Sequence, residues 1–192
     1  MLRRHRPLAA AAVAACTVGV LAGCGATPAA PEPASPTPGI VVDQPQCRIP
    51  EVLADLGLRL DAGLVATPHP AAPVVDVTPT GFTAVGVLEC AVGGRMRDGS
   101  GTWTAVTATS RDGAPDDVAA VVAALAEPAP TESCDGDAAP LALWLLDAMG
   151  RGVRMRLPVD ECGGLSRSVR DALDRLTATG IRDEPVARVP LP

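Results

Sequence analysis

The chain has 192 residues, and 22 acidic residues outnumber 16 arginines, which gives a formal charge of −6 in the complete absence of lysine. Such an acidic chain lacks the basic stripe that nucleic-acid phosphates require. Its only aromatic residues, Phe82, Trp103 and Trp144, form no platform on which bases could stack. We therefore expect no nucleic-acid partner.

The N-terminal region has the pattern of an export signal. Basic Arg3, Arg4 and Arg6 precede an apolar run, Leu8 to Ala22, that is short and rich in alanine for a membrane span. We predict that residues 1–23 are a signal peptide. Their removal leaves 13 arginines against 22 acids and a charge of −9.

The end of this signal, Leu21-Ala22-Gly23-Cys24, resembles the lipobox of bacterial lipoproteins. The resemblance implies that the Cys24 thiol receives a diacylglyceryl group and becomes the mature N-terminus. Each buried methylene contributes about 0.8 kcal/mol, so two acyl chains hold a protein on a membrane where one does not. The implied partner is the membrane, and the implied location is the outer face of the cytoplasmic membrane, in the cell envelope.

The composition of the whole chain agrees with a bacterial origin, and one alternative for the N-terminus stays open. The bias toward Ala, Pro, Gly and Arg is similar to that of high-GC bacteria such as actinobacteria. The alternative for the N-terminus is an ordinary secretory signal cut at a nearby alanine-rich site, which leaves Cys24 unmodified.

The composition then divides the chain into segments. Residues 24–46 comprise the lipidated Cys24 and a Pro-rich stretch with nothing to bury, which we expect to be an extended tether reaching up to roughly 60 Å. A single folded domain is predicted for residues 47–180, with a C-terminal tail at 181–192.

The first half of the domain predicts a helix followed by strands. Pro50 to Leu56 fits a short helix, because proline suits the first helical position. Val74 to Val77 is a candidate short strand. β-Branched residues predict two further strands, Phe82–Cys90 and Thr102–Thr109, joined by a hairpin loop over the Gly-rich residues 93–101.

The second half repeats the order of strands and helix. Ala114 to Ala126 has one apolar face at helical spacing, and Leu141 to Leu146 reads as a buried strand. In the strand Gly152–Leu157, apolar residues alternate with arginines, which predicts one face in the core and one in water. A final helix begins at the capping residue Ser166 and ends at Gly180.

These elements together predict the fold class. Their order, approximately α-ββα-ββα, indicates an α+β domain in which the helices pack on one face of an antiparallel sheet. Disulfide bonds are expected to cross-link this domain, because the protein is exported.

Four cysteines lie beyond the signal and the anchor, namely Cys47, Cys90, Cys134 and Cys162, and no Cys-x-x-Cys pair of a zinc ribbon or dithiol enzyme occurs. Three pairings of four cysteines are possible. We favour Cys47 with Cys90 and Cys134 with Cys162. Each bond is expected to add roughly 3 to 4 kcal/mol to the free energy of unfolding. The alternative is four reduced thiols.

The sequence offers little for catalysis. His69 is the single histidine after processing and lies between prolines, so we expect a surface residue; no Gly-x-Ser-x-Gly motif supplies a nucleophile. Residues 98–101 are interpreted as a turn, and the acidic clusters near 112–117 and 135–137 lack the ligand pattern of a calcium loop. We predict no catalytic residue, no metal and no cofactor.

Recognition is the remaining possibility. The hairpin loop carries Arg95, Met96 and Arg97, and a basic stripe on this acidic domain could be lined by Arg151, Arg154 and Arg156. Arginine suits anionic partners. The alternative is that these arginines are the ordinary solvated side of their strands.

From residue 85 to Cys162, the layout of strand, helix, cysteine and strand resembles that of the subtilisin-inhibitor-like proteins of actinomycetes. In that family the reactive peptide bond follows the third cysteine, which here is Cys134. The specificity position falls on Gly136, which has no side chain, and the short first disulfide of the family has no counterpart after Cys90. The resemblance implies a similar fold more than it implies inhibition.

The leading hypothesis from the sequence is a non-catalytic, membrane-anchored envelope lipoprotein with a binding or scaffolding domain for an unknown protein or small molecule. A protease-inhibitor-like module is the second hypothesis, and a hydrolase using His69 is the third.

Overall fold

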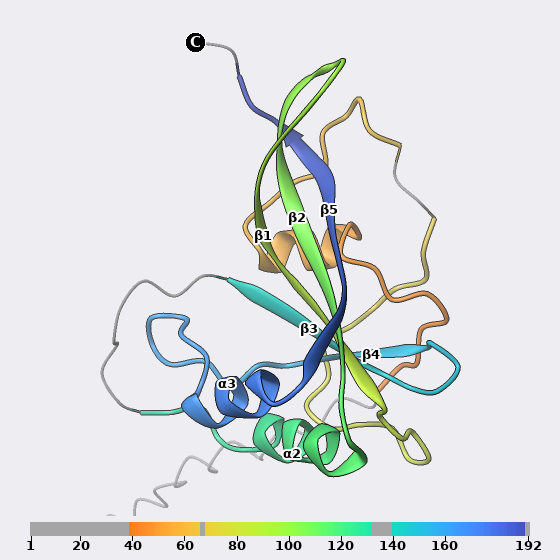
Figure 1. Cartoon of the computed structure of the whole chain (residues 1–192), viewed down its shortest axis with the longest axis vertical. Coiled ribbons are helices and arrows are strands. Elements are labelled where there is room, and N and C mark those ends of the chain that lie inside the picture. The colour runs from red at the N-terminus through yellow and green to blue at the C-terminus, as the bar shows by residue number, and fades with distance from the viewer. Residues whose placement is uncertain (1–38, 66–67, 132–139, 191–192) are drawn as a thin grey trace, which may run out of the picture. The chain divides into compact units, whose positions relative to one another are not determined.

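The computed structural model describes residues 39–65, 68–131 and 140–190 (Figure 1). Every described residue belongs to one compact unit, residues 35–192. The predictions for the signal peptide, for Cys24 and for the loop around Cys134 therefore lie outside the described residues. Within the described part, no helix has both the length and the apolar character needed to cross a membrane.

One five-stranded sheet forms the centre of this unit, with the strands in the order β4-β3-β1-β2-β5. All four neighbouring pairs are antiparallel, as predicted. The strands are β1 (Gly86–Asp98), β2 (Gly101–Asp112), β3 (Leu141–Leu146), β4 (Gly152–Met155) and β5 (Thr177–Arg188).

Three helices accompany the sheet, and the residues that begin them are those that the sequence indicated. Proline occupies the first turn of α1 (Pro50–Asp55) and of α2 (Pro115–Leu125). Ser166 caps α3 (Arg167–Asp174), because its hydroxyl accepts a hydrogen bond of 3.4 Å from the backbone N–H of Val169.

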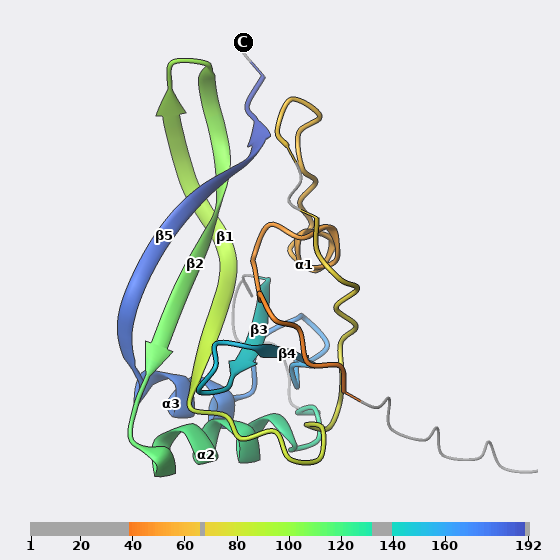
Figure 2. The same cartoon turned by 90° about the vertical axis from the view of Figure 1, so that its right-hand side faces the viewer.

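The helices cover both faces of the sheet, not one. On β3, Leu143 and Leu145 belong to the apolar cluster that contains α2 and α3, whereas Ala142 and Trp144 belong to the cluster that contains α1. Figure 2 shows α1 separated from α2 and α3. The prediction of one covered face is therefore wrong for α1, because central strands that are apolar on both faces require cover on both.

The N-terminal segment covers the outer edge of β4. Val42 pairs with Gly152, and Val75 pairs with Met155. The expected strand at Val74–Val77 is thus reduced to a single bridge. Gly152 allows this close approach, because a Cβ atom there would lie 2.8 Å from Cβ of Pro45.

The β1–β2 hairpin is longer than predicted. Residues 93–101 were expected to form its loop, but β1 continues to Asp98 and only Gly99 and Ser100 separate the strands. Gly93 and Gly94 form a bulge in β1. A Cβ atom on Gly93 would lie 2.5 Å from Oγ1 of Thr107, so glycine marks a close approach of the two strands here and not a turn.

The C-terminal part differs most from the prediction. The last helix ends at Asp174 instead of Gly180, and β5 occupies residues 177–188, which include most of the expected tail. Only Val186 in this strand is fully buried, so apolar alternation is absent. The backbone pairing with β2 determines the conformation.

Candidate functional site

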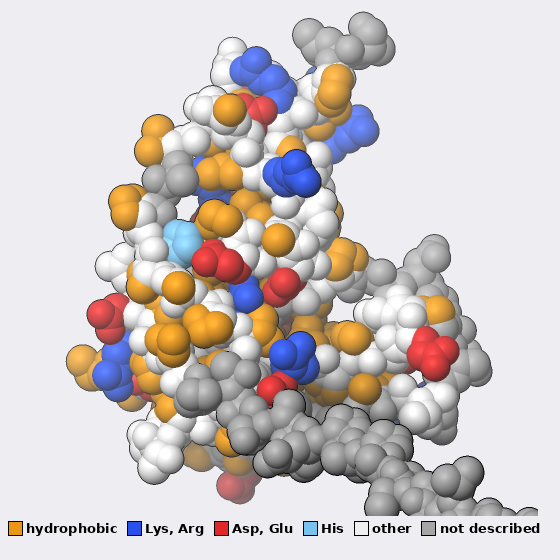
Figure 3. All heavy atoms as spheres, turned by 180° about the vertical axis from the view of Figure 1, so that it is seen from behind, with side chains coloured by type: hydrophobic (Ala, Val, Ile, Leu, Met, Phe, Trp, Pro, Cys, Tyr) orange, Lys and Arg blue, Asp and Glu red, His pale blue; other side chains and the backbone are white. Residues whose placement is uncertain are grey.

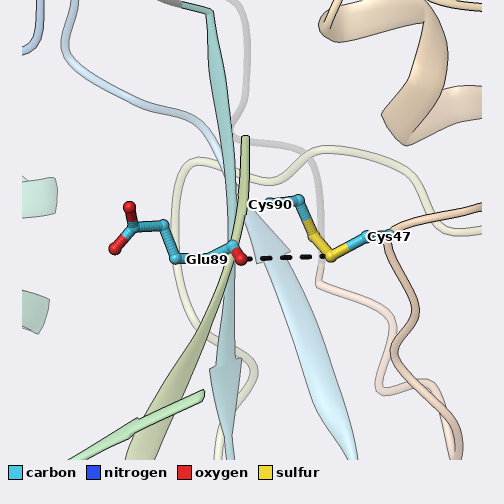
Figure 4. The surroundings of a disulfide bond; sticks show 3 residues. All are labelled: Cys47, Glu89 and Cys90. Carbon is cyan, nitrogen blue, oxygen red and sulfur yellow. Dashed lines mark hydrogen bonds between the residues drawn. A yellow bond between two sulfur atoms is a disulfide. The ribbon is translucent and has the colours of Figure 1, made fainter. Parts of the chain in front are cut away.

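The predicted disulfide between Cys47 and Cys90 is confirmed (Figure 4). Their Cα atoms are 5.4 Å apart, both residues are buried, and Sγ of Cys47 lies 4.0 Å from the carbonyl oxygen of Glu89. The bond attaches the N-terminal segment to the middle of β1. Cys162 is also disulfide-bonded. Cys134 lies outside the described residues, so its pairing with Cys162 stays a prediction.

The tip of the β1–β2 hairpin is organised by one carboxylate. Oδ1 of Asp98 accepts hydrogen bonds from the backbone N–H of Ser100 at 2.8 Å and of Gly101 at 3.0 Å, and from the Ser100 hydroxyl at 2.6 Å. It also accepts one from Nε1 of Trp103 at 3.0 Å. The interpretation of residues 98–101 as a turn is therefore confirmed.

A second set of contacts ties β5 to this tip. Trp103 is only 4% exposed, and the Arg188 guanidinium lies 5.1 Å from the centre of its ring. Nη2 of Arg188 donates a hydrogen bond of 2.7 Å to the carbonyl oxygen of Ser100. No local pattern in the sequence indicates this role for Arg188, because the role follows from the pairing of β5 with β2.

The hairpin places the predicted recognition residues on opposite faces. Arg95 is paired with Thr104 and Arg97 with Thr102, so both arginines point to one face, and both are exposed. Met96 is half-buried and lies opposite Trp103 on the other face. Figure 3 shows basic side chains gathered at the upper end of the unit, which is the hairpin end in Figure 1.

The predicted basic stripe on β4 is not formed. Arg154, expected in water, is 6% exposed, and its Nη1 lies 3.8 Å from Oδ2 of Asp55. Burial lowers the pKa of Arg154, while Asp55 and Glu51 oppose this change. Arg156 follows β4, is largely exposed and forms an ion pair with Asp76. The physical reason is that Arg154 pairs with Trp144 of β3, whose side chain packs in the same cluster as α1, and Asp55 of α1 lies against the guanidinium.

His69 is more enclosed than a surface residue, with a side chain that is 14% exposed. Its Nδ1 lies 2.8 Å from the carbonyl oxygen of Pro70, and its Nε2 lies 3.7 Å from Oε2 of Glu51. In the described part of the chain, both ring nitrogens thus face protein groups other than a serine hydroxyl, and neither is poised to activate a nucleophile.

The turn at Asp98 predicts a specific pH dependence. Hydrogen bonds from the Ser100 hydroxyl and then from Trp103 lower the pKa of Asp98 from 3.8 to about 2. Because the folded pKa lies below the unfolded one, this contribution to stability is complete above about pH 4 and is lost as the pH falls through about 2. An NMR titration of the Asp98 carboxyl should show this midpoint, with the Trp103 indole proton moving in parallel.

Asp98→Asn is the matched control for that titration, because the amide oxygen still accepts the hydrogen bonds of the turn but carries no titrating proton. The pH-dependent shift of the Trp103 indole proton should disappear in this variant. A midpoint for Asp98 close to 3.8 in the wild type would contradict the hydrogen-bonding geometry.

The protease-inhibitor resemblance places its reactive bond after Cys134, in residues outside the described ranges, so that expectation stays a prediction. Within residues 39–65, 68–131 and 140–190, no three or more His, Cys, Asp or Glu side chains are grouped so as to hold a metal ion. Comparison with known proteins gave no match: no family model fits the sequence, and neither a curated protein nor a solved structure is similar to it.

Proposed function

We propose that this protein is a lipid-anchored lipoprotein of the bacterial envelope whose folded domain is a non-catalytic binding module. The anchor rests on Leu21-Ala22-Gly23-Cys24, which follows the predicted signal peptide. Two acyl chains on Cys24 would keep the chain at the outer face of the cytoplasmic membrane. The disulfide between Cys47 and Cys90 suits a location outside the cytoplasm.

The observation that carries the binding role is the placement of the hairpin. Figures 1 and 2 both place the start of the described chain and the tip of the β1–β2 hairpin toward opposite ends of the unit. The N-terminal segment is attached through Val42 to Gly152 and through Cys47 to Cys90. A domain held at one end and extended at the other is suited to presenting that far end to a partner.

The polar groups of the domain also support binding over catalysis. His69 is engaged by Pro70 and Glu51, and the Asp98 carboxylate is engaged by the turn that it organises. A catalytic site requires an acid or base within reach of a reacting group in a pocket. The side chains that face outward at the hairpin, Arg95 and Arg97, are suited instead to holding an anionic partner.

Replacement of the anchoring cysteine tests the proposal. In cells fed a labelled fatty acid, the wild-type chain should incorporate the label and sediment with membranes. Cys24→Ala should lose both properties, because it removes the only thiol in the lipobox-like segment. Cys16→Ala is the matched control, since it removes a nearby cysteine from the apolar run and should change neither.

Two results would contradict the proposal. The first is a wild-type chain that takes up no label. The second is a Cys24→Ala chain that partitions into membranes as completely as the wild type does, which would mean that the apolar run of the uncleaved signal holds it there.

A further inference from the structure

The outer half of β1 has an open edge. The pairing of β1 with β3 ends at Ala91, opposite Leu141, whereas its pairing with β2 continues to Asp98. Across the described ranges, residues 92–98 have no backbone partner on the side away from β2. The N–H and C=O groups on this side of a strand are a template for another strand.

The side chains along this edge include two exposed arginines. Arg95 and Arg97 are exposed on the same face, and Val92, on that face before the bulge, is 41% exposed. No ion pair among the described residues includes either arginine. The nearby Asp98 forms no ion pair with either arginine among the described residues, and its carboxylate accepts the four hydrogen bonds at the tip of the hairpin.

The edge is also held in its extended form before any partner binds. The Asp98 turn closes the hairpin, and Arg188 links β5 to it through Trp103 and Ser100. A strand that is already ordered loses little conformational entropy on binding, so more of the interaction energy appears as affinity.

The charge of the edge determines which kind of strand fits. A second copy of this chain would bring Arg95 and Arg97 against the same residues, and like charges on facing strands are destabilising. An acidic strand instead gains charge-assisted hydrogen bonds from both guanidinium groups.

We propose that the edge of β1 from Val92 to Arg97 binds an extended acidic segment of a partner protein as an added strand. The backbone supplies affinity, and acidic side chains at alternate positions of the partner face Arg95 and Arg97. This inference rests on the proposed function in one respect, namely that the domain is a binding module; it does not require the lipid.

A labelled peptide tests the inference. The probe is an eight-residue peptide with Asp at every second position and Thr or Val between, and its binding to the purified full chain in detergent is followed by fluorescence anisotropy. Two peptides serve as controls: one of the same composition with the Asp residues adjacent, and one N-methylated at alternate residues. Both should bind at least tenfold more weakly, because the first loses the alternation and the second cannot pair as a strand.

Variants of the chain locate the site. The double variant R95Q/R97Q should bind the alternating peptide at least tenfold more weakly than the wild type, with little change in urea stability, since both side chains are exposed. The matched control is R170Q/R182Q, which removes two exposed arginines from α3 and β5 and should bind as the wild type does.

Four results would overturn the inference. Equal binding of the alternating and rearranged peptides, or equal weakening in the two double variants, would show general attraction between charges. Absence of binding would refute it directly. Binding that appears only after D135N/D137N would assign the edge to the chain's own acidic segment. Performing the assay on both the wild type and Cys24→Ala separates failure of this inference from failure of the lipid anchor.

Discussion

Removing the disulfide by the double substitution C47A/C90A is expected to lower the free energy of unfolding by about 4 kcal/mol. The bond closes a loop of 43 residues, and in the chain-entropy model a cross-link of this size stabilises the fold by that amount through its restriction of the unfolded chain. Urea unfolding followed by circular dichroism measures the change as a lower midpoint. Because domains have stabilities of about 5 to 15 kcal/mol, much of the total would be lost.

A second pair of substitutions separates the cross-link from packing. Both cysteines are buried, so C47S/C90S adds two buried hydroxyl groups and should be less stable than C47A/C90A. A midpoint for C47A/C90A equal to that of the wild type would contradict a stabilising role for the bond.

The second large effect is expected at Trp144, the largest fully buried side chain of the unit. Trp144→Ala should destabilise the domain by about 3 to 5 kcal/mol, because it leaves a cavity between β3 and the segment that carries α1. Fluorescence of Trp103, the other tryptophan, reports urea unfolding in this variant independently of circular dichroism.

Trp144→Phe is the informative control for that experiment. Nε1 of Trp144 is buried and has no hydrogen-bond partner in the described residues. Phenylalanine therefore removes an N–H group that forms no stabilising hydrogen bond, and it keeps most of the aromatic ring. We expect it to lose less than half of the stability lost by Trp144→Ala. Equal losses in the two variants would indicate that the indole N–H, not the volume of the ring, is important.

Several elements could be predicted because a local interaction determines them. The prolines at Pro50 and Pro115 and the hydroxyl of Ser166 mark the starts of α1, α2 and α3 through the geometry of the first helical turn. The apolar run of β3 has the bounds Leu141–Leu146 that the sequence indicated. The turn at Asp98 follows from the ability of its side chain to accept nearby N–H groups.

The candidate site was predicted only in part. The sequence indicates Arg95 and Arg97 as possible recognition residues in a loop. The structure places both in a strand, on the same face and beyond the end of the β1–β3 pairing. Arg154 was assigned to water by alternation along its strand. That pattern reports which residues share a face, and it does not report what lies against the face.

Features that depend on neighbours within a few residues can be predicted from the order of the amino acids: the helix starts, the turn at Asp98, the apolar strand β3 and the lipobox-like segment. Long-range contacts are needed to pair β5 with β2, to cover Arg154 with α1 and to extend β1 past β3. In each of these cases the decisive contact joins residues far apart in the chain. Their burial and backbone pairing therefore depend on how the sheet is assembled, and local propensity does not contain that information.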